Sequence, residues 1–176
     1  MRILGIDPGY ALMGWSIVDY NKSKFSLIEF GCIDTPAGMP MPKRLAQIYE
    51  EINRVIEQYE PSVASIEELY FQNNAKTAIQ VGQARGIAIL SCYNHGLEIN
   101  EYTPLQIKQS VSGYGNADKK QVQEMVKIIL HLDKIPKPDD AADAVAAAIC
   151  CGNESGGSLG KKIDNSYRKN KKKIEI

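Results

Sequence analysis

The sequence lacks the features that mark zinc proteins, membrane proteins and secreted disulfide-rich proteins. Its 176 residues include only four cysteines, and none of these forms a C-x-x-C pair, which argues against a zinc site. No apolar run approaches the roughly 18 residues that span a bilayer, and the N-terminus lacks the layout of a signal peptide. We therefore expect reduced thiols and a cytoplasmic protein without membrane contact.

A net charge is also lacking, because 21 basic residues balance 21 acidic residues. The balance hides an asymmetry, since residues 161–176 carry a net charge of +5 and the remainder carries −5. A basic tail is consistent with nucleic-acid contact, although a solvated, disordered tail is the favoured interpretation of charge alone. We expect one domain over residues 1–151, followed by a basic, disordered tail over residues 152–176.

Hydrophobic periodicity predicts the order of strands and helices. Three strands in a meander come first, and later strands alternate with helices, a pattern typical of a mixed sheet with helices on its faces. We therefore predict an α/β domain with a five-stranded mixed sheet flanked by helices. The predicted strands cover residues 2–7, 13–20, 24–34, 62–67 and 97–102, and the predicted helices cover about 42–60, 75–95, 104–111, 118–132 and 139–151.

Two carboxylates follow buried apolar runs at the ends of predicted strands. Asp7 ends the first strand and Glu67 ends the fourth, and ligands of such sheets bind outside the carboxyl ends of the strands. Asp before Pro-Gly also makes a good turn, and an exposed strand tip would explain either residue. Because side chains alternate along a strand, only one of Glu67 and Glu68 can face the Asp7 side.

Two more carboxylates, Asp140 and Asp143, lie three residues apart on the last predicted helix, which puts them on one helical face. The helix is rich in alanine and can lie close to the sheet. Acidic residues are also favoured in a first helical turn, so a capping or dipole role is an alternative. We expect Asp139 to be the capping residue in either case.

Asp7, Glu67, Asp140 and Asp143 together offer hard oxygen ligands without His or Cys. That set suits Mg²⁺, or Mn²⁺ in its place, rather than zinc. Four clustered carboxylates repel one another, and a pair of divalent ions would relieve that repulsion. Such a pair would create a phosphoryl-transfer site, with one ion activating a water and the other stabilising the leaving oxygen.

Several motifs, in order over about residues 2–150, resemble the RuvC family of Holliday junction resolvases. They begin with G-I-D-P-G at residues 5–9 and G-W at 14–15, and continue with I-E at 66–67 followed by Tyr70. G-Q-A-R-G at 82–86, E-Y at 101–102 and Q-I-K-Q at 106–109 follow. Gly113, the run K-K-Q-V at 119–122 and D-A-A-D-A at 140–144 complete the set. G-I-D-P-G alone is weak, but the ordered set is specific.

The resemblance implies a ribonuclease H-like fold and a homodimer that makes paired symmetric nicks in four-way DNA junctions. It implies that the four carboxylates are catalytic and bind two metal ions per subunit. It also places an aromatic at the junction centre on Tyr70, where Phe is familiar, and assigns DNA-binding basic residues to Lys108 and Lys119. A branch-migration complex is a partner that only the resemblance implies.

Three other functions compete with a junction resolvase. An actin-like ATPase or sugar kinase also uses G-I-D-P-G, but it needs two such domains and a second phosphate loop that this sequence lacks. A ribonuclease H-like nuclease acting on RNA or an RNA–DNA hybrid would use the same fold and metals. A non-catalytic junction-binding module would be expected to lose a carboxylate, and all four are present. We therefore predict a structure-specific endonuclease that leaves 5′-phosphate and 3′-hydroxyl ends.

Overall fold

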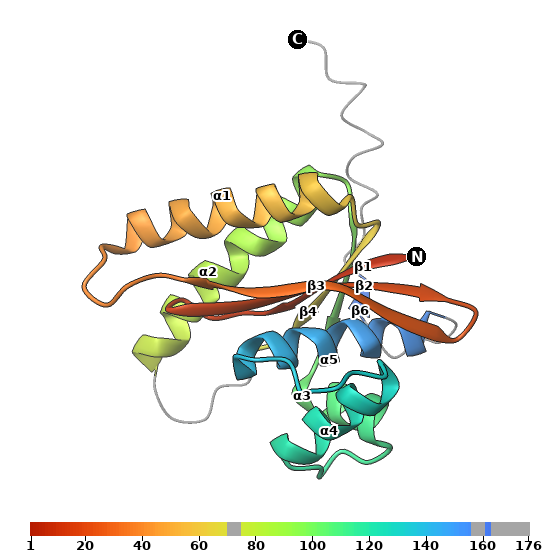
Figure 1. Ribbon diagram of the computed structural model, residues 1–176. Coiled ribbons are helices and arrows are strands. Elements are labelled where there is room, and N and C mark those ends of the chain that lie inside the picture. The colour runs from red at the N-terminus through yellow and green to blue at the C-terminus, as the bar shows by residue number, and fades with distance from the viewer. Residues whose placement is uncertain (70–74, 156–160, 163–176) are drawn as a thin grey trace.

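The computed structural model describes residues 1–69, 75–155 and 161–162 (Figure 1). Its strands form one mixed sheet in the order β3-β2-β1-β4-β5-β6. β1 pairs antiparallel with β2 and parallel with β4, and β4 pairs parallel with β5. The elements are β1 (Arg2–Asp7), β2 (Leu12–Asn21), β3 (Lys24–Asp34), α1 (Met41–Tyr59), β4 (Val63–Glu67), α2 (Ala75–Asn94), β5 (Glu98–Tyr102), α3 (Pro104–Ser112), α4 (Lys119–Ile129), α5 (Asp139–Glu154) and β6 (Lys161–Lys162).

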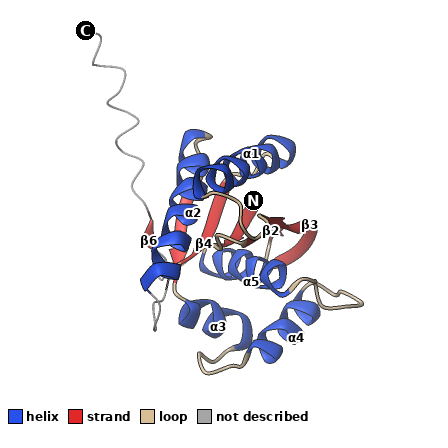
Figure 2. Cartoon of the chain, turned by 90° about the vertical axis from the view of Figure 1, so that its left-hand side faces the viewer, coloured by secondary structure: helices blue, strands red, loops and turns tan. Residues whose placement is uncertain are grey.

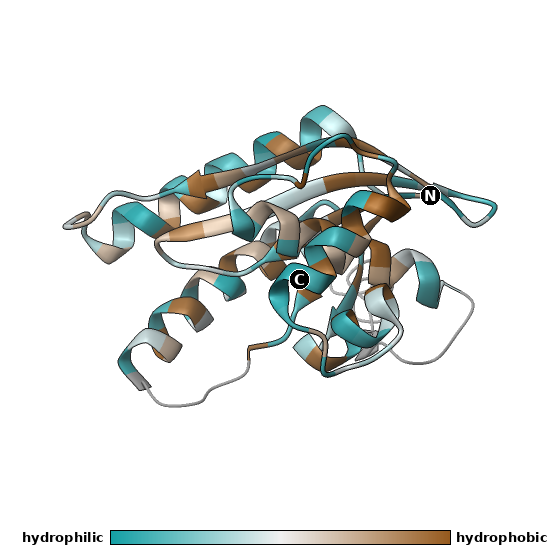
Figure 3. Ribbon diagram, turned by 60° about the horizontal axis from the view of Figure 1, so that its bottom comes forward, coloured by the Kyte–Doolittle hydropathy of each residue, from teal (hydrophilic) through white to brown (hydrophobic). Residues whose placement is uncertain are grey.

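Helices cover both faces of the sheet, as Figures 1 and 2 show from two directions. α1 and α2 lie on one face, where they share a core with Leu4 and Ile6 of β1. α5 lies on the other face, with α3 and α4 beyond it, and shares a second core with Ile3. The alternation along β1 thus sends successive side chains into two cores. Figure 3 shows hydrophilic and hydrophobic bands along the covering helices, as expected for helices buried on one side.

α5 packs directly on the sheet because small residues face it. A Cβ on Gly5 would lie 2.1 Å from the Ala144 carbonyl oxygen, so only glycine permits this approach. Two fully buried serines fasten the helix by donating to its carbonyl oxygens: Ser16 to Ala144 at 3.0 Å and Ser65 to Ala147 at 2.6 Å. The position of the helix on the sheet is therefore set by backbone contacts as well as by apolar packing.

The predicted fold class is confirmed: an α/β, ribonuclease H-like mixed sheet flanked by helices. A two-residue strand, β6, adds to the five strands that were predicted, and α5 continues to Glu154, beyond the expected end at residue 151. The capping role expected for Asp139 is wrong, because Pro138 is the N-cap and Asp139 is the first helical residue. Among the described residues, no helix has the length and apolar character to cross a membrane.

Candidate active site

Strand register places Asp7 and Glu67 on the same face of the sheet. Gly5 of β1 pairs with Ser65 of β4, and both face α5. Asp7 and Glu67 each follow two residues later, so both point to the α5 side. Glu68 has the opposite parity and points to the side of α1 and α2. The alternation of side chains thus places Glu67, and not Glu68, on the face of the sheet that carries Asp7.

The first turn of α5 brings Asp140 and Asp143 to the same edge. A Cβ on Gly14 of β2, which pairs with Asp7, would lie 2.0 Å from the Asp140 carbonyl oxygen. The helix start therefore lies against the strand pair that carries Asp7. Asp140 and Asp143 both raise the pKa of Asp7 through their charges, which shows that the carboxyls share one electrostatic environment.

Burial and mutual repulsion keep protons on this cluster. Burial is the largest cause that raises the pKa of Asp7, to about 8, and the charges of Glu67, Asp143 and Asp140 add to it. Burial and the charge of Asp143 likewise raise the pKa of Glu67 to about 7, against the lowering effect of its hydrogen bond with Asp7. The pair of carboxyls therefore holds a proton to higher pH than two separate carboxyls would. A divalent cation would displace that proton by stabilising both negative charges.

Two lysines supply the positive charge beside the carboxyls. The Lys119 ammonium lies 2.8 Å from an Asp143 carboxylate oxygen, and the charge of Lys108 lowers the pKa of Glu67. Burial nevertheless keeps the pKa of Asp143 above its ordinary value. Glu67, Asp143, Lys108 and Lys119 line one cavity of about 200 Å³. Acidic and basic side chains thus meet in a single hollow, which suits a phosphate held next to a cation.

Asp139 and Asp140 are adjacent but have different surroundings. The Asp139 carboxylate lies 2.6 Å from the Lys137 ammonium and 3.7 Å from that of Lys119, and the hydrogen bond from Lys137 lowers its pKa. The charge of Asp140 instead raises the pKa of Asp7 and the pKa of Cys32. The charge of Asp140 thus acts on Asp7, while the charges of both residues raise the pKa of Asp143.

The chemistry of the donor set fits Mg²⁺ or Mn²⁺. Four carboxyls supply hard oxygen ligands, and two of them have pKa values raised by burial and crowding. Within residues 1–69, 75–155 and 161–162, no three His, Cys, Asp or Glu side chains are already arranged around one metal position. In this structure the Asp7 and Glu67 carboxyls interact with each other, and Asp143 is in an ion pair with Lys119.

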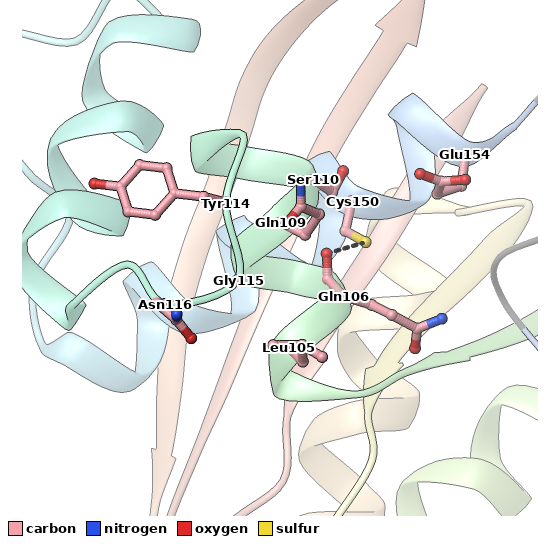
Figure 4. A pocket seen from close by; sticks show the side chains of 9 residues that line it. All are labelled: Leu105, Gln106, Gln109, Ser110, Tyr114, Gly115, Asn116, Cys150 and Glu154. Atoms are coloured by element: carbon pink, nitrogen blue, oxygen red, sulfur yellow. Dashed lines mark hydrogen bonds between the residues drawn. The ribbon is translucent and has the colours of Figure 1, made fainter.

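The position of Tyr70 relative to this cluster is not described, and a second cavity lies apart from it. Tyr70 lies outside the described residues. A larger cavity, of about 470 Å³, lies between α3, the loop after it and the end of α5 (Figure 4). Its only charged described lining residue is Glu154, and Gln106 and Cys150 lie in its wall, where the Cys150 thiol contacts the Gln106 carbonyl at 3.8 Å. Without a basic side chain in that lining, it is unsuited to a phosphate backbone.

Three residues that contact the segments carrying the cluster were not singled out from the sequence: Gly14, Ser65 and Arg85. The only sequence signal for Ser65 is a hydroxyl inside an otherwise apolar strand, V-A-S-I-E. Gly14 and Arg85 were visible only as members of family motifs. Arg85 of α2 donates from Nε to the Glu67 carbonyl oxygen at 3.3 Å, a contact between segments 18 residues apart.

A six-stranded mixed sheet in this order, with acidic side chains at the tips of β1 and β4 and on the helix that crosses them, defines the ribonuclease H-like class. The family model described as "Crossover junction endodeoxyribonuclease RuvC" matches residues 3–151. The chain therefore belongs to the RuvC family.

Relatives and solved structures agree with that assignment. A protein of Finegoldia magna named crossover junction endodeoxyribonuclease RuvC is 58% identical over 150 residues, which cover 85% of this chain and 92% of that protein. One of Alkaliphilus oremlandii with the same name is 56% identical, with the same coverage. The structure of Thermus thermophilus RuvC has a TM-score of 0.86 at 29% identity and covers 93% of this chain and all of that one. The same Thermus protein in complex with a Holliday junction substrate has a TM-score of 0.84 at 27% identity, again over 93% and 100%.

Proposed function

We propose that the chain is a Mg²⁺-dependent endonuclease that resolves four-way DNA junctions by paired symmetric nicks in recombination and repair. One observation carries the proposal: Asp7 and Glu67 point from neighbouring strand ends to the side of α5 that holds Asp140 and Asp143. Family membership supplies the substrate, since a relative has been solved in complex with a Holliday junction. We place this activity in the cytoplasm.

The four carboxylates hold the metal, and the two lysines hold the DNA. Asp7, Glu67, Asp140 and Asp143 would bind two divalent ions, which supply activation of a water and neutralisation of the leaving 3′ oxygen. Asp7 and Glu67 must first lose the proton that joins them. Lys108 and Lys119 line the cavity next to Glu67 and Asp143, where each ammonium can contact a phosphate oxygen beside the scissile bond. Tyr70 would stack on an unpaired base at the junction centre.

Symmetric cutting requires two active sites, and α2 offers the surface for a homodimer. Ile79 is 64% exposed and Leu90 is 48% exposed. A Cβ on Gly86 would meet nothing within 4 Å, and one on Gly82 would meet only the Leu69 side chain at 3.8 Å. These four residues recur at helical spacing and leave a stripe that a second copy of α2 can approach closely. The stripe favours a dimer contact over the internal packing that small residues at this spacing also suggest.

The tail and the partner of the dimer complete the proposal. We retain the nuclease domain predicted over residues 1–151, whose last helix continues to Glu154, and a basic tail after it, of which Lys161–Lys162 pair with β5. We take a branch-migration complex as the partner that moves the junction. Both parts rest on the sequence and its family resemblance.

A nicking assay on three substrates tests the proposal. The full-length protein is incubated with Mg²⁺ and a synthetic four-way junction, the matching duplex or an RNA–DNA hybrid. We expect symmetric nicks in the junction only, because its shape and open centre provide the specificity. Cleavage of the hybrid without cleavage of the junction would replace a resolvase by a ribonuclease.

A further inference from the structure

Behind the carboxylate cluster, on the opposite face of the sheet, an arginine touches the main chain of Glu67. Arg85 of α2 donates to the Glu67 carbonyl oxygen at 3.3 Å, and its guanidinium forms an ion pair with Glu101 of β5. Glu101 pairs with Ile66 in the β4–β5 register, one residue before Glu67. Arg85 therefore connects α2 with the ends of two neighbouring strands.

The Arg85–Glu101 pair is largely removed from water, with side chains 19% and 15% exposed. A pair buried to this degree adds little net stability, because the loss of hydration offsets the attraction. What it supplies is geometry, since a planar guanidinium can bind a carboxylate and a carbonyl oxygen at the same time in fixed directions. Burial also lowers the pKa of Arg85 from its ordinary value, and the group stays charged at all working pH values.

The contact lies where β4 leaves the sheet. β4 ends at Glu67, and the Glu68 amide donates to the Tyr102 carbonyl oxygen at 2.8 Å. The Arg85 bond adds a second attachment at the same strand end, from α2 rather than from β5. The attachment thus acts on the main chain of Glu67, from which its carboxylate side chain extends.

We propose that Arg85, held by Glu101, is a positioning residue that fixes the end of β4 and thereby aims the Glu67 carboxylate at the metal position. The inference rests on the proposed role of Glu67 as a metal ligand. Partners that orient ligands in this way change metal affinity or activity by about 10–100-fold when removed. Because Arg85 lies on the helix that carries the Gly82–Gly86 stripe, the same residue links the proposed dimer face to the active site.

The test compares Arg85→Met, Arg85→Lys and Glu101→Gln with the full-length wild type. Methionine keeps the apolar stem of Arg85 and removes its charge and donors. We expect Arg85→Met to lower the single-turnover rate of junction cutting by about 10–100-fold and to raise the Mg²⁺ concentration for half-maximal cutting. Arg85→Lys should be intermediate, because one ammonium cannot serve both acceptors in the same geometry. The control is Arg54→Met, which removes an exposed arginine paired with Glu51.

Three readouts separate positioning from a general effect on folding. Junction affinity without metal should stay within about twofold of wild type. The shift in Tm on adding Ca²⁺, which reports metal binding without cutting, should shrink. Hydrogen exchange of the Glu68 amide should speed up while exchange in β1 stays unchanged.

The inference is overturned if Arg85→Met cuts at the wild-type rate with the wild-type Mg²⁺ requirement. It is also overturned if cutting, junction binding and Tm fall together in Arg85→Met while Glu101→Gln behaves as wild type. If Arg85→Met does not fold, Glu101→Gln decides, because it keeps an acceptor and loses only the charge. A raised Mg²⁺ requirement in Glu101→Gln then supports the inference, and a wild-type requirement overturns it. A wild type that does not cut, or a Glu67→Gln variant that does, would refute the proposed function instead, and exchange at Glu68 would still report on the contact.

Discussion

Asp7 and Glu67 end neighbouring parallel strands, point to the same face of the sheet and share a hydrogen bond between their carboxyls. Two carboxyls share a proton in this way when burial makes the doubly charged state costly. The clustered carboxyls therefore favour positive charge at this edge of the sheet. Lys119 supplies one such charge through its ion pair with Asp143, and a divalent cation would supply more.

Glu67 and Glu68 provide a matched pair of substitutions at one strand end. Glu67→Gln should reduce single-turnover junction cutting by at least about 10³-fold, because it removes a charged ligand from the cluster. Glu68→Gln, on the other face of the sheet, should reduce it far less. Quantified nicking of a labelled junction measures both. Equal losses in the two variants would show that strand parity does not decide which glutamate acts.

The raised pKa values of Asp7 and Glu67 predict how stability depends on pH. A carboxyl whose pKa is raised in the folded state binds more protons there than in the unfolded chain, so the free energy of unfolding falls as pH rises. The window runs from the ordinary carboxyl value near 4 to about 8 for Asp7 and about 7 for Glu67. Without divalent metal, Asp7→Asn should therefore raise Tm at pH 8 and have little effect at pH 4.

Thermal unfolding in a chelating buffer at both pH values measures this difference. A gain of about 1 kcal/mol corresponds to about 2–4 °C for a chain of this size. Added Mg²⁺ should raise Tm of the wild type at pH 8 and leave that of Asp7→Asn nearly unchanged. An Asp7→Asn variant that is less stable than wild type at pH 8 would contradict the assignment of raised pKa values.

Lys119 and Lys120 are adjacent exposed lysines that differ in their surroundings. Only Lys119 is described in an ion pair with Asp143 and in the lining of the cavity with Glu67. Lys119→Gln should lower the cutting rate by about 10–100-fold, through loss of a phosphate contact and of the charge beside Asp143. Lys120→Gln should stay within about threefold of wild type. If the two variants lose activity equally, Lys119 contributes only to the overall positive charge of this surface and makes no specific phosphate contact.

Gly14 sets how closely α5 approaches the sheet. In Gly14→Ala the new Cβ would lie 2.0 Å from the Asp140 carbonyl oxygen, which is backbone and cannot turn aside. The start of α5 must shift, and Asp140 and Asp143 must shift with it. We expect a loss of about 1–3 kcal/mol in stability and of about 10²-fold in cutting. Gly86→Ala is the stability control, because no atom of the same chain lies within 4 Å of the added Cβ. It is compared in the Ile79→Glu background, so that the proposed dimer face plays no part, and should unfold no more readily than Ile79→Glu alone.

The exposed stripe on α2 is the proposed dimer face, and it predicts which substitution abolishes a dimer. Ile79→Glu, at a position 64% exposed in the single chain, should convert a dimer to a monomer without loss of helix content. Ile128→Glu on α4, at a position 59% exposed, is the matched control and should remain dimeric. Sedimentation velocity and circular dichroism measure the two properties. A monomeric Ile128→Glu variant beside a dimeric Ile79→Glu variant would place the interface on α4.

Much of the fold could be predicted because the pattern of apolar residues along the sequence indicates which side chains are buried. The buried apolar runs in Arg2–Asp7 and Val63–Glu67 predicted both strands. The alternation of side chains along a strand restricted the choice between Glu67 and Glu68 before any register was known. Asp118 caps α4, where its side chain accepts from the Gln121 amide at 2.8 Å, and Asp is among the residue types favoured at this position. These features depend on neighbours only a few residues away in the chain.

The features that the sequence did not predict depend on contacts between distant segments, or on neighbouring residues that compete for the same role. Asp139 does not cap α5, because Asp139 is already the first helical residue and the extended residue Pro138 is the N-cap. The Asp139 carboxylate pairs with Lys137 instead. β6 is two lysines with no apolar alternation to reveal it. The Arg85–Glu101 pair joins a helix to a strand across the fold. No spacing in the sequence encodes that contact, although each residue lay in a family motif.

The most direct test of the account is the cutting of a synthetic four-way junction by wild type and Asp7→Asn, measured with Mg²⁺ beside junction binding measured without it. The account predicts paired symmetric nicks by the wild type. It predicts no cutting by Asp7→Asn, with junction affinity within about twofold of wild type. An Asp7→Asn variant that still cuts the junction would contradict the assignment of the four carboxylates as the catalytic centre.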